Sequence, residues 1–297
     1  MRPRPILPGA TYLVSRRCTQ RQFLLTPSAE TTAIFGYCLA VAAKRAGVQV
    51  HSVCVMSNHW HAVLTDPEAR LPAFLAYLHQ YVAKAVNASL GRWENLWATE
   101  QPSLVRLLGP EDTLDKTRYL VSNPVVAGLV KRAARWPGLL CYLPRHSKSF
   151  RRPKRFFRTV GPMPEQAKLE LTVPPVWGNS GASDFERRLS ELVRAEEDRV
   201  ERRHVASKQP FLGAKRVCAQ KPTDQPQTRE PRRGLSPRVA GGATGLCIAM
   251  LDRLKTFVAA YREAWKRWRG GARNVRFPAG TYALRVHAGV LCEESAG

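Results

Sequence analysis

The sequence predicts an α+β fold in which helices cover an antiparallel sheet, the ferredoxin-like arrangement. The order of the elements predicts it: a strand-like run and an amphipathic helix come first, then two strand-like runs joined by a tight turn, then a second amphipathic helix. At 297 residues, the chain is long enough to bury a core of this kind. We expect the domain to occupy residues 1–145, followed by a basic, partly helical C-terminal extension over residues 146–297.

The first strand and the first helix follow from local composition. ATYLVSRR (10–17) has a β-rich centre closed by two arginines, which is typical of a strand. Thr26 and Pro27 are a good N-cap and first helical position, and Gly47 is a good helix end. A helix is therefore expected between them.

A hairpin and a second helix complete the expected order. VQVHSVCVM (48–56) and HWHAVLT (59–65) are extended runs, with Ser57 and Asn58 as the only turn between them. Apolar residues then recur at helical spacing over about residues 71–90. The two helices and the hairpin together predict one compact α+β domain.

A shorter helix is expected after Gly109 and Pro110, in EDTLDKTRYLVSNPVVAGLV. It should end near Asn123 and Pro124, because the residue before a proline is disfavoured in the α region.

The extension is expected to hold two long helices. The first spans 183–205, opens with a capping box of Ser183 and Glu186, and turns four apolar residues inward. These are Phe185, Leu189, Leu192 and Val200. The second spans about 246–269, and its inward stripe is Leu251, Leu254, Phe257, Val258, Tyr261, Trp265 and Trp268.

Two other parts of the extension have biased composition. The stretch HSKSFRRPKRFFR (146–158) interleaves basic residues with three phenylalanines, and it is either a solvated linker or a segment whose rings stack on bases. Residues 219–243 are rich in Pro, Gln, Arg and Gly, which is typical of a linker or flexible loop.

The charge indicates an anionic partner. Lys and Arg number 47 against 23 Asp and Glu, a formal net charge of +24. The excess occurs in both halves, with 17 basic and 8 acidic residues in 1–145 and 30 and 15 in 146–297. This balance favours a polyphosphate such as a nucleic acid, and both halves could contact it.

The cysteines and the hydropathy indicate the cellular location. The seven cysteines are odd in number, scattered and never in a C-x-x-C spacing, which favours a reduced protein without a disulfide framework or zinc knuckle. No signal-peptide core and no apolar run of about 18 residues occurs. We expect a cytoplasmic protein without a membrane partner.

Two histidines lie one residue apart in the run VCVMSNHWHAVL (53–64). Residues i and i+2 of a strand project from one face, so His59 and His61 direct two imidazoles at one point, which is a metal-ligand geometry. A metal that acts on phosphate also needs oxygen ligands, so a third ligand must come from elsewhere. Cys54 could complete a zinc site, although a core thiol is the favoured interpretation, and Asn58 is expected to shape the turn.

Tyr119 and Asn123 stand four residues apart in the short helix and therefore share one of its faces. A phenol beside a metal can attack a phosphodiester and form a covalent phosphotyrosine. Its free pKa is about 10, so such a phenol needs activation. A packed helix tyrosine is the alternative interpretation of Tyr119.

The two motifs together resemble a known family. MSNHWHAVL is similar to the HUH motif (His, bulky apolar residue, His) of single-tyrosine HUH transposases. RYLVSNPVVAGLV, whose tyrosine lies 58 residues beyond His61, is similar to the segment in which REP-associated tyrosine transposases keep their nucleophile. The resemblance extends over roughly residues 8–145.

The resemblance implies a ferredoxin-like HUH endonuclease domain that nicks single-stranded DNA, often near a hairpin, with Mg2+ or Mn2+. It implies that His59 and His61 bind the metal, that Asn123 takes the third protein-ligand position and that Tyr119 is the nucleophile. One departure is that Leu96 and Trp97 are followed by ATEQP and not by the basic stretch of the relatives.

Three points stay open at this stage. In related enzymes the tyrosine acts in its own subunit or in a partner's, so the chain could be a monomer or a homodimer. A non-catalytic nucleic-acid-binding protein derived from such a transposase is the alternative function. A zinc hydrolase or structural zinc protein is a third candidate.

Overall fold

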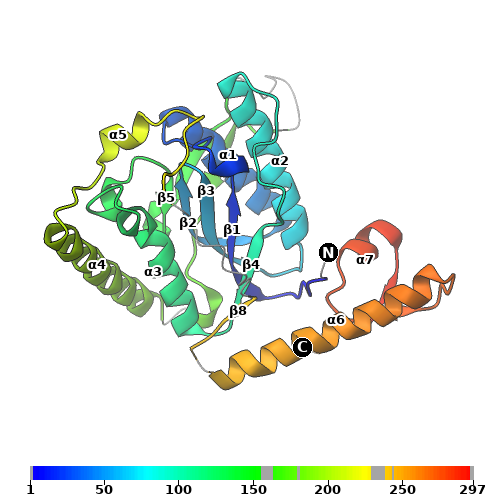
Figure 1. Ribbon diagram of the computed structural model, residues 1–297. Helices are drawn as coiled ribbons and strands as arrows, with labels where there is room; N and C mark the ends of the chain where they lie inside the picture. Colours follow the sequence, from blue (N-terminus) through cyan, green and yellow to red (C-terminus); the bar gives the residue numbers. More distant parts are fainter. Residues whose placement is uncertain (1–2, 155–162, 179–180, 229–237, 243, 295–297) are drawn as a thin grey trace.

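The computed structural model of the protein describes residues 3–154, 163–178, 181–228, 238–242 and 244–294. A six-stranded sheet lies at its centre, in the order β5-β2-β3-β1-β4-β8 (Figure 1). Its strands are β1 (Ala10–Arg17), β2 (Gln49–Met56), β3 (His59–Asp66), β4 (Ser103–Leu107), β5 (Leu140–Cys141) and β8 (Val239–Ala240). The helices are α1 (Ala29–Ala46), α2 (Leu71–Leu90), α3 (Pro110–Val126), α4 (Ala182–Ala206), α5 (Ala214–Cys218), α6 (Thr244–Arg269) and α7 (Ala283–Ala288).

The first half of the chain has the ferredoxin-like arrangement, which confirms the predicted α+β fold. β1 pairs antiparallel with β3 and β4, and β2 pairs antiparallel with β3 and β5. β8 joins β4 in parallel orientation. The sequence analysis did not predict β4, because its five residues are too short to show a clear period of two.

Helices cover both faces of this sheet (Figure 1). On one face, Val14 of β1 and Trp60 of β3 pack into a core with residues of α1 and α2. On the other, Leu13 and Val63 pack into a second core with residues of α3 and α4 such as Leu120. Because side chains alternate along a strand, the odd-numbered residues of β3 point toward α3.

The predicted helix ends need two corrections. The N-cap of α1 is Ser28, not Thr26, and its hydroxyl accepts a hydrogen bond of 2.9 Å from the backbone N–H of Thr31. α3 continues through Pro124 to Val126. A proline in the last helical turn removes only a single helical hydrogen bond, and Pro124 is buried. α2 has the predicted bounds.

α4 forms as expected but begins and faces differently. Its N-cap is Gly181, so Ser183 and Glu186 both lie inside the helix and form no capping box. Leu192 was expected to face inward and is 38% exposed, whereas Val193 is buried. α4 packs on α3, so the extension contributes to the second core.

The basic stretch after residue 145 is partly a strand. β6 (Lys148–Arg151) pairs with β7 (Gln166–Leu169), and both contact α1. Phe150 is buried against Gly36, where a Cβ atom would collide with the ring, so this phenylalanine is a core residue. Phe156 and Phe157 lie outside the described residues. The division of the chain at residue 145 stays a prediction, while segments on both sides of it share the two cores.

α6 lies beside the sheet edge with most of its surface exposed (Figure 1). Of the stripe predicted to face inward, Phe257 is buried, Tyr261, Trp265 and Trp268 are partly buried, and Leu251 is 41% exposed. The expectation of a full core stripe was wrong, because the helix meets only a small cluster that includes β9 (Arg276–Phe277) and β10 (Leu291–Cys292).

Within the expected linker, β8 adds to the sheet and residues 229–237 and 243 lie outside the described residues. No helix in the described ranges is long and apolar enough to cross a membrane.

We predict that His51 makes the fold sensitive to acid. Its Nε2 lies 2.7 Å from the Thr65 hydroxyl and its Nδ1 lies 2.9 Å from the Thr172 carbonyl oxygen. Burial lowers the pKa of His51 to about 4. The unfolded chain takes up this proton near pH 6.5 and the folded chain only near pH 4, so the free energy of unfolding falls by ~3 kcal/mol over that window.

Urea denaturation at pH 7 and pH 5 measures this contribution in wild type and in His51→Gln. We expect the free energy of unfolding to depend less steeply on pH in the variant, by ~1.4 kcal/mol per pH unit, because the variant lacks one group that binds a proton on unfolding. An unchanged pH dependence would contradict the role of His51.

Candidate active site

His59 and His61 lie together at the end of β3 that follows the Ser57 and Asn58 turn. β1 and β2 flank them, with Arg17 opposite His59 and with Ser15 and Cys54 opposite His61. The two ring centroids are 4.8 Å apart and the rings are nearly perpendicular. Strand alternation therefore brings the imidazoles to one point on the face that carries α3.

Asn58 orients His59. Its side-chain N–H group donates to the Arg21 carbonyl oxygen over 3.1 Å, so its Oδ1 faces Nδ1 of His59, 2.6 Å away. Because an amide oxygen can only accept, Nδ1 of His59 carries a proton, which leaves Nε2 as the nitrogen that could bind a metal. The sequence analysis assigned Asn58 to the turn and missed this second role, although its position next to His59 was the available signal.

His61 is almost fully buried. Burial lowers the pKa of His61 well below its usual value, and the neighbouring His59 lowers it further. Its Nδ1 is buried and has no hydrogen-bond partner in the described part of the chain. A buried nitrogen without a partner is costly, and its presence in a neutral imidazole fits a group that binds a cation.

Tyr119 reaches the histidines from α3. Its ring centroid lies 5.6 Å from that of His61, in an edge-to-face arrangement. α3 starts at Gly109 and Pro110 with acidic residues in its first turn, and Leu120 and Val121 anchor its buried face on the sheet. Tyr119 itself is 45% exposed, which argues against a merely packed tyrosine.

The surroundings of Tyr119 act on its acidity in two directions. Partial burial raises the pKa of the Tyr119 phenol, and the positive charge of Lys116 one turn earlier lowers it, with burial the larger effect. The phenol therefore needs further activation before it can act as a nucleophile.

Asn123 lies one turn beyond Tyr119, and both line a cavity of about 580 Å³ between α3 and α4. The side chain of Asn123 makes no hydrogen bond within the described ranges, and none links it to the histidines. The structure thus brings His59, His61 and Tyr119 together and places Asn123 beside Tyr119.

The extension supplies the other wall of this cavity, which the sequence analysis did not foresee. Leu192, Ala195, Glu196 and Arg199 of α4 line it. Glu196 forms ion pairs with Arg118 of α3 at 3.5 Å and with Arg199 at 2.6 Å. α4 therefore stands directly beside the tyrosine.

Cys54 is a core thiol. It is fully buried, and burial raises the pKa of its thiol far above the usual value. Among the described residues, no group of three or more His, Cys, Asp or Glu side chains could hold a metal ion. A His-His-Cys zinc site is therefore not formed.

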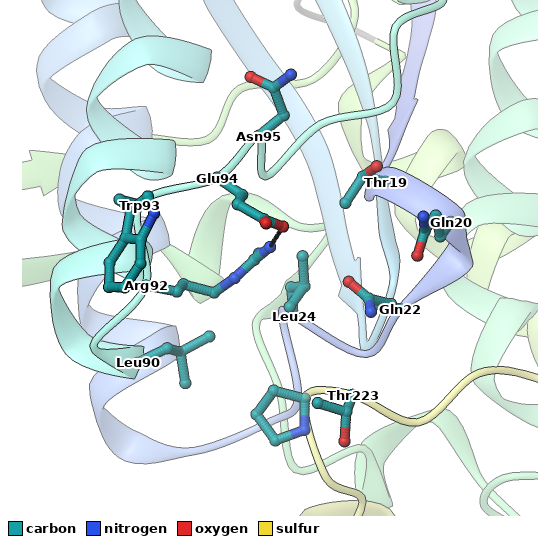
Figure 2. Close-up of a pocket in the computed structure, with 11 residues that line it drawn as sticks. Thr19, Gln20, Gln22, Leu24, Leu90, Arg92, Trp93, Glu94, Asn95 and Thr223 are labelled. Carbon is teal, nitrogen blue, oxygen red and sulfur yellow. Dashed lines mark ion pairs between the residues drawn. The ribbon is translucent and has the colours of Figure 1, made fainter.

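A second cleft has a volume of about 780 Å³ and lies between segments that are distant in the sequence (Figure 2). One wall is the short 3-10 helix Thr19–Arg21 and its flanks, with Gln20 and Gln22, and the other is the loop after α2, with Arg92, Trp93 and Asn95. Trp93 is 90% exposed. Sequence reasoning missed this cleft, because its walls are far apart in the chain.

The backbone of the cleft wall is strained and connected to His59. Gln20 and Arg21 have φ angles of 49° and 59°, in the left-handed region that residues other than glycine rarely adopt. The carbonyl of Arg21 accepts the hydrogen bond from Asn58, whose amide oxygen faces His59. Two hydrogen bonds thus join the cleft to the histidine pair.

Comparison with solved structures finds several chains that are similar to this one, and two of them are described here. A REP-associated tyrosine transposase bound to a REP hairpin shares 17% identity, with 46% of this chain and 79% of that chain covered, at a TM-score of 0.39. A protein described as a transposase from Deinococcus radiodurans R1 shares 18% identity, with 41% of this chain and 96% of that chain covered, at a TM-score of 0.30. No family model matches the chain, and no curated protein matches its sequence.

Proposed function

We propose that this protein is a metal-dependent endonuclease and strand transferase of the transposase type, which nicks single-stranded DNA through a covalent 5'-phosphotyrosine. One observation carries the proposal: the Tyr119 ring lies 5.6 Å from the ring of His61, and that ring lies 4.8 Å from the ring of His59. A candidate nucleophile and two imidazoles thus meet on one face of the sheet.

The residues present fit a divalent metal such as Mg2+ or Mn2+. An unprotonated imidazole nitrogen is a suitable metal ligand, and the buried Nδ1 of His61 lacks any other partner in the described structure. His59 and His61 would hold the ion, and Asn123 would supply an oxygen. When bound, the ion would polarise the scissile phosphodiester and favour the ionised phenol.

The role of Tyr119 follows from the chemistry of a phosphodiester. Its hydroxyl loses a proton to water, the phenolic oxygen forms a bond to phosphorus, and the bond from phosphorus to the 3' oxygen breaks. The 3' oxygen takes up a proton and leaves as a free hydroxyl. Because the phosphotyrosine conserves the ester bond, another 3' hydroxyl can attack it and rejoin strands without a nucleotide cofactor.

The cleft beside Asn58 supports a single-stranded substrate. An exposed indole offers a stacking surface to an unpaired base, and amide side chains can hydrogen-bond to base edges. Gln20, Gln22 and Asn95 make no side-chain hydrogen bonds within the described chain, so their amides are available. With the net charge of +24, this cleft favours DNA regions such as hairpin flanks, where bases are unpaired.

We predict that Tyr119→Phe abolishes adduct formation. Wild type should convert labelled, hairpin-containing single-stranded DNA in Mn2+ into a protease-sensitive covalent adduct on a denaturing gel. The variant should lose the adduct by about a thousandfold or more, because it lacks the nucleophilic oxygen. Tyr261→Phe, on α6, is the matched control and should retain it. No adduct with wild type across a broad hairpin library, with binding intact, would favour the non-catalytic binding protein.

We predict that Asn58→Ala weakens Mn2+ binding by about 10- to 100-fold, because the imidazole of His59 loses the group that fixes its tautomer. Asn58→Asp keeps an acceptor oxygen at the same place and should restore most of the affinity. Calorimetric titration with Mn2+ alone measures both variants. Equal affinity in wild type and Asn58→Ala would rule out the orienting role.

We predict that Trp93→Ala weakens binding of single-stranded DNA. Stacking of one base on an aromatic ring contributes ~1–3 kcal/mol, so the dissociation constant should rise by roughly 5- to 150-fold. Fluorescence anisotropy with single-stranded and duplex oligonucleotides should show a smaller loss for the duplex, and Trp93→Phe should keep most of the affinity. An equal loss for both forms of DNA would refute base stacking in the cleft.

A further inference from the structure

A cavity far from the histidines is lined by four arginines. It has a volume of about 580 Å³ and lies between the N-terminal segment, the β4 edge of the sheet and α6. Its basic residues are Arg4, Arg106, Arg238 and Arg253. Each of four parts of the chain that are distant in sequence thus contributes one guanidinium group to this cavity.

These charges have no carboxylate partners. No Asp or Glu lines the cavity in the described part of the chain, and none of the four arginines forms an ion pair there. Arg4 donates to the Pro102 carbonyl oxygen over 2.7 Å, and Arg106 lies 3.6 Å from the sulfur of Met250, so their observed partners are neutral. Burial lowers the pKa of Arg4, and the nearby Arg238 lowers it further.

Other arginines of the protein show what ordinary pairing looks like. Arg132 contacts three carboxylates of α4, and Arg188 makes two short hydrogen bonds with Glu111. Like charges that gather without such partners repel each other, and a bound anion would remove that repulsion. The cavity therefore holds positive charge that no carboxylate neutralises, in contrast to the ion-paired surfaces.

We propose that this cavity is a binding site for phosphoryl groups, from either a nucleic-acid strand or a free polyphosphate. Guanidinium groups match phosphate oxygens with paired N–H donors. Leu104, Leu254 and Phe257 form apolar walls, which strengthen the attraction by excluding water.

The site is separate from the candidate active site. Arg106 pairs with Tyr12 near the start of β1, whereas His59 pairs with Arg17 at its end. Tyr12 and Arg17 are five residues apart along β1, which corresponds to a separation of roughly 17 Å. Because the arginines come from the N-terminal segment, β4, the β8 segment and α6, a bound anion would also fasten α6 to the sheet.

The test is thermal unfolding of the full chain with increasing pyrophosphate, against sodium chloride at equal ionic strength. Wild type should show a saturable rise in melting temperature, because a ligand that binds only the folded state stabilises it. R106Q/R253Q should need about tenfold more pyrophosphate, since each lost charge-assisted hydrogen bond weakens binding. R187Q/K255Q removes two ion-paired charges elsewhere and is the matched control, which should respond like wild type.

Calorimetry then separates the two sources of phosphate. Displacement of pyrophosphate by a single-stranded oligonucleotide would assign the site to strand phosphates, and failure to displace it would assign the site to a free polyphosphate. R253Q alone, at an exposed position, provides a milder variant should the double variant fold poorly. No saturable response in wild type, or equal responses in wild type and the cavity variants, would overturn the proposal. Neither result depends on the Tyr119 adduct, so failure of the nicking reaction leaves this test intact.

Discussion

The alternation of side chains along β3 is the constraint on which the rest of this structure depends. Trp60, between the two histidines, belongs to the core with α1 and α2, so His59 and His61 must face the opposite side. A slip of one residue in the pairing of β3 with β1 would bury both imidazoles in that core. Burial of Trp60 on one face of the sheet therefore determines that the two imidazoles point to the other face.

The same constraint explains why the second face of the sheet matters for the chemistry. α3 lies on the face to which the histidines point, anchored by Leu120 and Val121, and so brings Tyr119 to His61. α4 then packs on α3 and closes the cavity beside the tyrosine. The extension is thus part of the site's surroundings, and Asn58 connects the opposite side of the histidine pair to the Trp93 cleft.

The sequence predicted those features that depend on local pattern. The period of two in β3 placed His59 and His61 on one face, and the spacing of four placed Tyr119 and Asn123 on one helix face. Features that depend on tertiary contacts were missed or misjudged. Leu192 and Leu251 have the helical spacing of core residues, but their helices meet too little of the molecule on that side to bury them. The Trp93 cleft and the arginine cavity join segments whose proximity no local pattern encodes.

The basic excess of the chain is distributed unevenly between the two long helices of the extension. α4 carries six basic and seven acidic side chains, and many of its arginines form ion pairs within the helix or with α3. α6 has six basic side chains and only two acidic ones, and Arg253 adds to the unpaired charges of β4 and the N-terminal segment. Since paired charges contribute little attraction at a distance, α6 contributes more unpaired positive charge than α4 does. A strand held there by its phosphates would lie along the same sheet that carries the histidines, which gives the extension a physical reason to be basic.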